Sequence, residues 1–339
     1  MLRKLFSSSS VGTEDKNATE SEAEKQDRRI GFTRKEMLSK DIFASIKPYT
    51  KHIFFGVGSG TGSTWPERFE SRGIGRLLDD IREDVAKALR KKTGDKPKEP
   101  KLKLSASDDT LGRVLIFPEQ VAYQLDDYTP LLEGGTPTRF EAQLNLIYRA
   151  HLFNDRSAHE EIAKDNVVVA QPLSGLPHIF ACVHLNRDKR CGYTGPRLVE
   201  ALQSELAKRG RKDIPVLGIS HIGGHKFAGN LIVMSSRSKH ITPASSKDAT
   251  QSDSKDNSIM GDWYGYVTLK DVEPIVDSIF AHTVIPRIWR GAMGVDLEYN
   301  DPDKDKEGAE PKPDSSGAKS DSPDACVGCD CEPSNKPKP

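Results

Sequence analysis

Two cysteines and two histidines have the most distinctive spacing in this sequence of 339 residues. Cys182 and Cys191 are separated by eight residues, and a His-Ile-Gly-Gly-His run from His221 to His225 follows. Thiolates and imidazoles bind zinc, and two of each also complete the outer coordination of two sulfide-bridged irons. The pattern therefore predicts a metal centre, which is either a [2Fe-2S] cluster or a Zn²⁺ site.

Both pairs of candidate ligands are placed next to apolar runs of strand length. The cysteine pair begins at the end of the run 178–183, and the histidine pair follows the run 216–219. Loops that follow neighbouring strands can meet at one end of a sheet, so we expect the four side chains to converge. Gly192, Gly223 and Gly224 remove side chains where the backbone must wrap closely around a metal centre.

Several polar residues lie beside the candidate ligands. Arg187, Arg190 and Lys226 could stabilise the negative charge of a reduced cluster, although an ordinary solvated loop explains the two arginines equally well. His184 forms a Cys-x-His pair with Cys182, as in the first half of a Rieske signature. No histidine follows the second cysteine as the other half requires, so we interpret His184 as a neighbour of the centre and not as a ligand.

The order of apolar segments occurs twice along the chain and indicates an internal repeat. Alignment of the two copies places Gly56 opposite Cys182 and Ser107 opposite His221, so only the second copy could hold a metal. A β-α-β-β order is typical of a thioredoxin-like half, and a further strand and helix follow the second copy. The expected strands are 52–55, 102–104, 114–117, 178–181, 216–219, 230–234 and 263–267, and the expected helices lie around 77–89, 198–206 and 270–281.

Longer motifs resemble the sucrase/ferredoxin-like family, which includes the fungal altered inheritance of mitochondria and actin patches distal proteins. The likeness covers roughly residues 30 to 295 and implies an electron-transfer protein with a thioredoxin-like [2Fe-2S] ferredoxin domain. The implied ligation is not of Rieske type, and its ligands are Cys182, Cys191, His221 and His225. The motifs that carry the resemblance are Arg187–Gly192, His221–Asn230, Trp263–Val267 and Trp289–Gly294.

We therefore predict an α/β protein with two thioredoxin-like lobes, of which the C-terminal lobe is the ferredoxin. Both ends of the chain are polar and poor in apolar residues, which predicts disordered tails. The predicted boundaries are a tail or targeting segment at 1–29, a lobe without ligands at 30–150, the cluster domain at 151–300 with a polar insertion at 235–257, and a tail at 301–339.

Other functions remain open at this point. Cys182 and Cys191 could instead handle protein disulfides, or Zn²⁺ could stabilise an interaction module. The spacing does not decide which iron would carry the histidines. A further cluster, Cys326, Cys329 and Cys331, has metal-like spacing, but it lies in the predicted tail, where no fold organises the thiols.

Composition limits the class of partner and the compartment. The 50 basic residues balance the 50 acidic ones, so net charge indicates no nucleic acid or membrane partner, and we expect a redox partner protein. Apolar runs are far shorter than the roughly 20 residues of a membrane-spanning helix. Five cysteines favour a reducing compartment. The basic, serine-rich start resembles a transit peptide, which favours a mitochondrion or another organelle, with the cytoplasm as the alternative.

Overall fold

The structure is a computed structural model of the whole chain. It describes residues 42–58, 64–69, 73–126, 139–165, 167–238 and 257–298, together with Lys25 and Arg29. These residues all belong to one compact unit that ends at Pro302. Both predicted tails, apart from these two single residues, lie outside the described part of the chain, as do Cys326, Cys329 and Cys331.

Ten strands of the described chain form one mixed sheet in the order β10-β9-β8-β6-β7-β2-β1-β3-β4-β5. The strands are β1 Lys51–Gly56, β2 Leu102–Ser107, β3 Arg113–Phe117, β4 Val121–Gln124, β5 Ala170–Pro172, β6 His178–Cys182, β7 Val216–Ile219, β8 Leu231–Ser238, β9 Asn257–Tyr264 and β10 Trp289–Met293. The α-helices of the same ranges are α3 Gly73–Thr93, α4 Arg139–His151, α5 Arg156–Asp165, α6 Lys189–Lys208 and α7 Val272–Phe280. The chain is therefore a mixed α/β protein.

The two halves of the sheet have the same strand order and directions. β1 pairs in parallel with β2 and antiparallel with β3, which pairs antiparallel with β4. β6, β7, β8 and β9 repeat this pattern in the second half. The halves meet at β2 and β7, where Ser107 pairs with Ile219. The repeated order predicted from the sequence is thus present, but the two copies share one sheet.

The register of the repeat differs from the sequence alignment by two residues. Ile53 pairs with Leu104 on β2, whereas Ile179, its counterpart on β6, pairs with Val216 on β7. The counterpart of His221 is therefore Asp109 and not Ser107. A shift by two residues keeps every side chain on the same face of a strand, so the apolar pattern could not reveal it.

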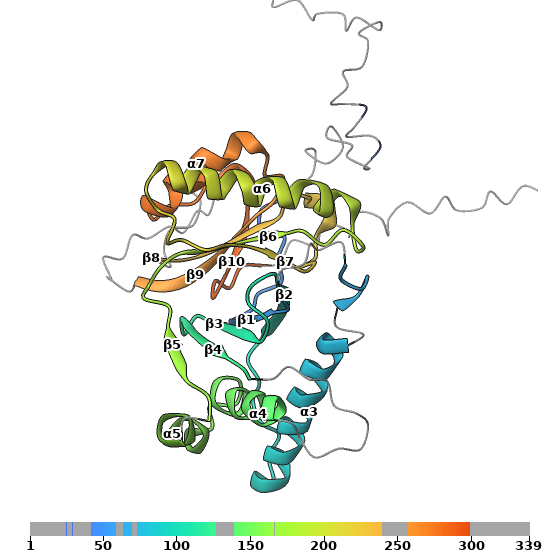
Figure 1. Cartoon of the computed structure of the whole chain (residues 1–339), viewed down its shortest axis with the longest axis vertical. Helices are drawn as coiled ribbons and strands as arrows, with labels where there is room; N and C mark the ends of the chain where they lie inside the picture. Colours follow the sequence, from blue (N-terminus) through green and yellow to red (C-terminus); the bar gives the residue numbers. More distant parts are fainter. Residues whose placement is uncertain are drawn as a thin grey trace, which may run out of the picture. The chain divides into compact units, whose positions relative to one another are not determined.

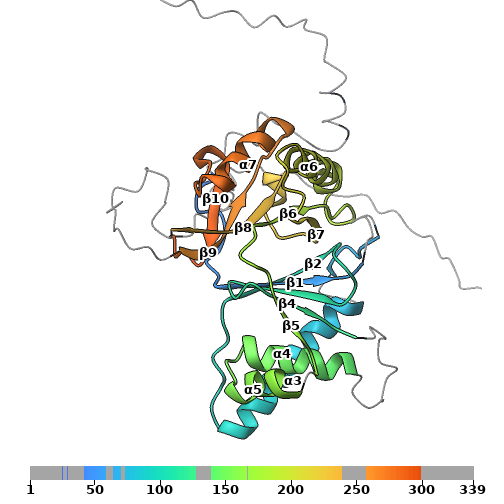
Figure 2. The same cartoon turned by 60° about the vertical axis from the view of Figure 1, so that its left-hand side comes forward.

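Successive side chains along each strand point to opposite faces of the sheet, so each half has an outer face and an inner face. Ile53 and Phe55 pack in the core beneath α3 and α4, while Phe54 points to the opposite face. There its ring stacks on that of Phe180 from β6, with centroids 3.7 Å apart. The two halves therefore face one another, and their helices lie on the outer faces: α3, α4 and α5 on one side, α6 and α7 on the other (Figures 1 and 2).

Two predicted boundaries are wrong. The aromatic strand predicted at 263–267 is the end of β9, because the chain leaves the sheet after Tyr264, and Tyr266 has a φ of 56°. The polar insertion predicted at 235–257 begins and ends in strand, since β8 and β9 stay paired as far as Ser238 and Asn257. Its middle, residues 239–256, lies outside the described residues.

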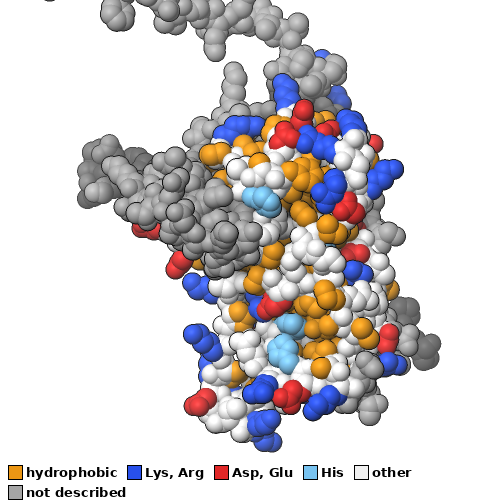
Figure 3. Space-filling view, turned by 90° about the vertical axis from the view of Figure 1, so that its left-hand side faces the viewer, with side chains coloured by type: hydrophobic (Ala, Val, Ile, Leu, Met, Phe, Trp, Pro, Cys, Tyr) orange, Lys and Arg blue, Asp and Glu red, His pale blue; other side chains and the backbone are white. Residues whose placement is uncertain are grey.

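The described helices include none that is long and apolar enough to cross a membrane. Side chains of both charges are interspersed with hydrophobic ones on the face shown in Figure 3. This mixture agrees with the balance of 50 basic and 50 acidic residues in the sequence.

Candidate metal centre

Three of the four predicted ligands converge at one end of the sheet. Cys182 is the last residue of β6, Cys191 lies in the first turn of α6, and His221 follows β7. One ligand atom from each, two sulfurs and a ring nitrogen, lie within 4.8 Å of one another. The Cys182 Sγ lies 3.8 Å from the His221 Nδ1. Because 2% of Cys182 and 1% of Cys191 are exposed, both thiols are shielded from solvent, whereas His221 is half-buried.

Backbone packing brings the two cysteines together. β6 and β7 are parallel, and Cys182 pairs with Ile219, so the chain leaves both strands at the same end. α6 then passes so close to the end of β6 that a Cβ on Gly195 would lie 2.1 Å from the Cys182 carbonyl oxygen. A Cβ on Gly192 would similarly meet Leu185 at 2.4 Å. These two glycines allow the helix to lie against the loop that carries the ligands.

The start of α6 is fixed by Asp188. Its carboxylate accepts the backbone N–H of Arg190 at 2.9 Å, as an N-cap does. The Arg190 guanidinium donates two further bonds to the same carboxylate. Arg190 therefore holds the cap in place while its positive charge stays near Cys191. The positive end of the helix dipole also favours negative charge on the sulfur of Cys191.

A hydrogen bond between the two thiols shifts their pKa values in opposite directions. A hydrogen bond from the thiol of Cys191 lowers the pKa of Cys182 well below its usual value, and His221 acts in the same direction. The same bond, followed by burial, raises the pKa of Cys191. Within the pair, Cys191 is therefore the hydrogen-bond donor, and negative charge is favoured on the sulfur of Cys182. A thiolate is the form that binds metal ions, and binding would displace the remaining proton.

His184 is part of the frame of the site. Its Nε2 donates to the Pro66 carbonyl at 2.8 Å, and its Nδ1 accepts the backbone N–H of His221 at 3.1 Å. Both ring nitrogens are thus used within the protein, and the ring is 1% exposed and lies edge-on to Trp65. This geometry supports the interpretation of His184 as a neighbour that holds the His221 backbone.

The buried side chain of Arg290 stabilises the loop that carries His221 and His225. Arg290 on β10 donates to the Asn230 Oδ1 at 2.7 Å, and Asn230 in turn donates to the Gly224 carbonyl at 3.1 Å. The guanidinium also donates to the side chain and carbonyl of Ser45, and a Cβ on Gly224 would lie 2.4 Å from it. Gly224 has a φ of 69°, which favours glycine on its own account. Arg290 thus ties the loop to the N-terminal part of the chain.

The remaining predicted residues have different outcomes. His225 begins the 3₁₀ helix η2 His225–Phe227, but its side chain lies outside the described part of the structure. Arg187 reaches Glu67 at 3.4 Å and is exposed, while the Lys226 ammonium lies 5.5 Å from the centre of the Phe227 ring. The structure therefore brings together Cys182, Cys191 and His221.

Sequence reasoning missed the supporting role of Arg290, Asn230 and Ser45. The signal was present in the strand Trp289–Met293, where a charged residue stands among apolar and small ones. A buried charge requires partners, so its position in such a strand could have indicated a polar network.

The family comparison agrees with the site. A family model described as sucrase/ferredoxin-like matches residues 42–291. The chain belongs to this family. The match spans both halves of the sheet and includes every predicted ligand, so the half without ligands is also a family feature.

Similar proteins come from several fungi. Altered inheritance of mitochondria protein 32 of Eremothecium gossypii is 27% identical over 53% of the chain and 55% of its own length. The protein of the same name from Debaryomyces hansenii is 36% identical over 34% of the chain and 35% of its own length. Actin patches distal protein 1 of Saccharomyces cerevisiae is 30% identical over 36% of the chain and 38% of its own length. The alignments thus span about half or less of these relatives. No solved structure matches the chain significantly.

The residues present fit a metal centre of the kind that the family name indicates. The donors are soft sulfurs and an imidazole, the pKa of the Cys182 thiol is lowered by its hydrogen bond from Cys191, and neither cysteine is engaged in a disulfide. Ala228, Tyr193, Ile222 and Tyr266 surround the sulfurs and exclude water from them. Such a site can hold a cation or cluster with net positive charge before ligation.

Proposed function

We propose that this chain binds a [2Fe-2S] cluster through Cys182, Cys191, His221 and His225 and serves as a one-electron carrier. The observation that carries the proposal is the convergence of two buried thiols and an imidazole in a member of a ferredoxin-like family. His225 is included because η2 starts four residues after His221, on the loop held by Arg290. We also propose that each half of the sheet is thioredoxin-like, on the basis of their common strand order.

A cluster bound here would take up and release one electron at a time. The residues of the chain supply the surroundings for that exchange. Cys182 and Cys191 hold the buried side and keep water from the sulfurs, while the half-buried His221 faces the more accessible side. The Nδ1 of His221 is the ring nitrogen that faces the Cys182 sulfur, at 3.8 Å.

Thiol–disulfide exchange is a second candidate, and the low pKa of Cys182 beside the Cys191 thiol favours it. Burial of both sulfurs opposes it, because an attacking thiolate must reach a disulfide in another molecule. Zinc would use the same donors. These alternatives predict a colourless protein.

Metal analysis tests the proposal. We expect protein purified without oxygen to be coloured and to contain about two irons and two sulfides per chain, as a [2Fe-2S] cluster requires. Cys182→Ser and His221→Ala should each lose iron, whereas His282→Ala, a change of an exposed histidine outside the site, should retain it. One equivalent of zinc without sulfide, or a metal-free disulfide between Cys182 and Cys191, would reject it.

We also propose import into a mitochondrion or another organelle, on the basis of the basic, serine-rich start of the sequence and of relatives named for altered inheritance of mitochondria.

A further inference from the structure

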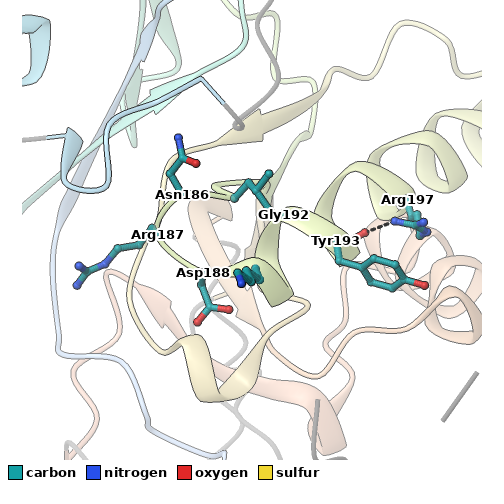
Figure 4. A pocket seen from close by; sticks show the side chains of 8 residues that line it. Asn186, Arg187, Asp188, Gly192, Tyr193 and Arg197 are labelled. Atoms are coloured by element: carbon teal, nitrogen blue, oxygen red, sulfur yellow. Dashed lines mark hydrogen bonds between the residues drawn. The ribbon is translucent and has the colours of Figure 1, made fainter. Parts of the chain in front are cut away.

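A pocket of about 650 Å³ opens beside the candidate metal centre. It lies between the loop after β6 and the first turns of α6 (Figure 4). Gly192, the residue after Cys191, forms part of its wall. Tyr193 contributes to the wall and also packs against the two cysteines, so one side chain borders both the pocket and the centre.

The charges of the pocket are mainly positive. Arg187, Lys189 and Arg197 line it and are exposed. The carboxylate in the lining, Asp188, is engaged by two bonds from Arg190. Arg187 does contact a carboxylate, that of Glu67 at 3.4 Å, but an exposed pair of this kind is weak. The pocket therefore attracts negatively charged groups.

The pocket also offers an apolar contact and a fixed aromatic one. Leu185 is 37% exposed at its edge. The Arg197 guanidinium lies 3.8 Å from the centre of the Tyr193 ring and donates to the Tyr193 carbonyl at 2.6 Å. Since this stacking already orders both side chains, less conformational entropy is lost when a partner binds. Exposed aromatic and arginine side chains are also enriched at protein interfaces.

We propose that this pocket docks the acidic contact surface of a redox partner protein, with an apolar side chain of that partner against Leu185 and Tyr193. The inference rests on the proposed function and identifies the surface that it uses. In the exchange, one electron leaves the reduced cofactor of the partner and is gained by the centre at Cys182 and Cys191. No bond is broken. Tyr193 is the side chain between the two.

The test compares two charge-reversal variants that change the net charge equally. The pocket variant is Lys189→Glu with Arg197→Glu, and the control is Lys208→Glu with Lys212→Glu. Lys189 and Lys208 are separated by roughly 28 Å along α6, well beyond the Debye length of about 10 Å at 0.1 M salt. An acidic residue at the first position of α6 is favourable for the helix, so the pocket variant should fold.

The probe is a recombinant flavodoxin, a small acidic flavoprotein, mixed with the full chain at low salt. Its dissociation constant, measured by calorimetry, should rise by at least about tenfold for the pocket variant and by less than about twofold for the control. The rate of electron transfer from the reduced probe should fall in proportion. The visible spectrum of both variants should match that of the unmodified chain, which shows that the centre is intact.

Equal effects of the two variants, or no effect on the dissociation constant, would overturn the docking surface. So would displacement of the probe by a few millimolar inorganic phosphate at constant ionic strength, since that would indicate a small-anion site. The calorimetric measurement of binding does not require a cluster in the protein. If the chain lacks an iron–sulfur spectrum, the proposed function fails, while calorimetry still decides whether the pocket binds an acidic protein.

Discussion

At the scale of single residues, each side chain at the site has a task that follows from its contacts. The hydrogen bond from Cys191 lowers the pKa of Cys182, and both ring nitrogens of His184 bond within the protein. The sequence predicted Cys182 as a ligand and His184 as a neighbour of the centre from residue type and spacing, but not the hydrogen bond between the two cysteines. An arginine in an apolar strand could have indicated a buried polar network, but not its partners, because nothing in the chain order relates residue 290 to residue 224.

The midpoint potential of the centre should depend on pH. Neutral imidazoles carry a ring proton that an oxidised centre releases more readily than a reduced one, so the potential should fall as pH rises. Between about pH 6 and pH 9 we expect a slope of up to about 59 mV per pH unit for a one-proton, one-electron step. Potentiometry at several pH values measures it. A potential that stays constant over this range would argue against histidine ligation.

The stability of the protein and of its metal site should depend on the planar guanidinium of Arg290 and not only on its positive charge. Arg290→Lys keeps a positive charge but cannot donate to Ser45 and Asn230 together. We expect a loss of about 2 kcal/mol in the free energy of unfolding, from bonds to a charged group, together with lower iron content. Thermal unfolding and metal analysis would measure both effects. The matched change Arg287→Lys, at an exposed arginine, should cause neither, and equal losses in both variants would refute the role of Arg290.

At the scale of elements, the close packing of α6 against the end of β6 is the main feature that brings the two cysteines together. The helix itself was predictable from its apolar spacing and from Gly210, which has a φ of 70° and follows the C-cap Arg209. At this end the backbone N–H of Arg211 donates to the Leu206 carbonyl, as in a Schellman motif. The closeness was not predictable, because Gly195 inside a helix has no local signal that distinguishes packing from chance.

Gly195→Ala gives a sharp test of that passage. In an ordinary helix this change stabilises by about 1 kcal/mol. Here the new Cβ would lie 2.1 Å from the Cys182 carbonyl, so we expect destabilisation by about 1 to 3 kcal/mol and loss of metal. Chemical unfolding and iron analysis would show it. Ser204→Ala, on the exposed side of the same helix, is the control, and a stabilised Gly195→Ala protein would show that α6 does not pass so close to β6.

At the scale of the whole described unit, two halves of similar order pack face to face through Phe54 and Phe180. Sequence reasoning predicted the repeat but assigned each copy its own lobe, because pairing between β2 and β7 leaves no signal in either strand. It also missed α4 and α5, which complete the outer layer of the first half. The half without ligands thus contributes to the core that supports the centre.

Buried histidines should make this unit sensitive to acid. Burial, more than any neighbouring charge, lowers the pKa of His151 to about 4, and its Nε2 accepts the Tyr123 hydroxyl at 2.7 Å. Neutral His151 therefore contributes its full stabilisation above about pH 6.5, the pKa of a histidine in the unfolded chain. This contribution is lost as the pH falls toward about 4.

From this shift we expect His151 to lower the free energy of unfolding by about 2 kcal/mol when the pH falls from 7.5 to 5. Denaturant unfolding at both pH values would measure the loss in the unmodified chain. His151→Gln keeps a hydrogen-bond acceptor for Tyr123 but has no proton to gain, so it should lose less stability than the unmodified chain over the same range. An identical loss in the two proteins would mean that His151 does not titrate in this way.

The central claim is that two cysteines and two histidines hold a [2Fe-2S] cluster. Electron paramagnetic resonance of the reduced protein, with its histidines labelled with ¹⁵N, tests this most directly. The account predicts a rhombic spectrum of a single unpaired electron, with hyperfine couplings to two histidine nitrogens, and the loss of this signal in His221→Ala. A protein without such a signal and with one bound zinc, or a cluster signal without histidine couplings, would contradict it.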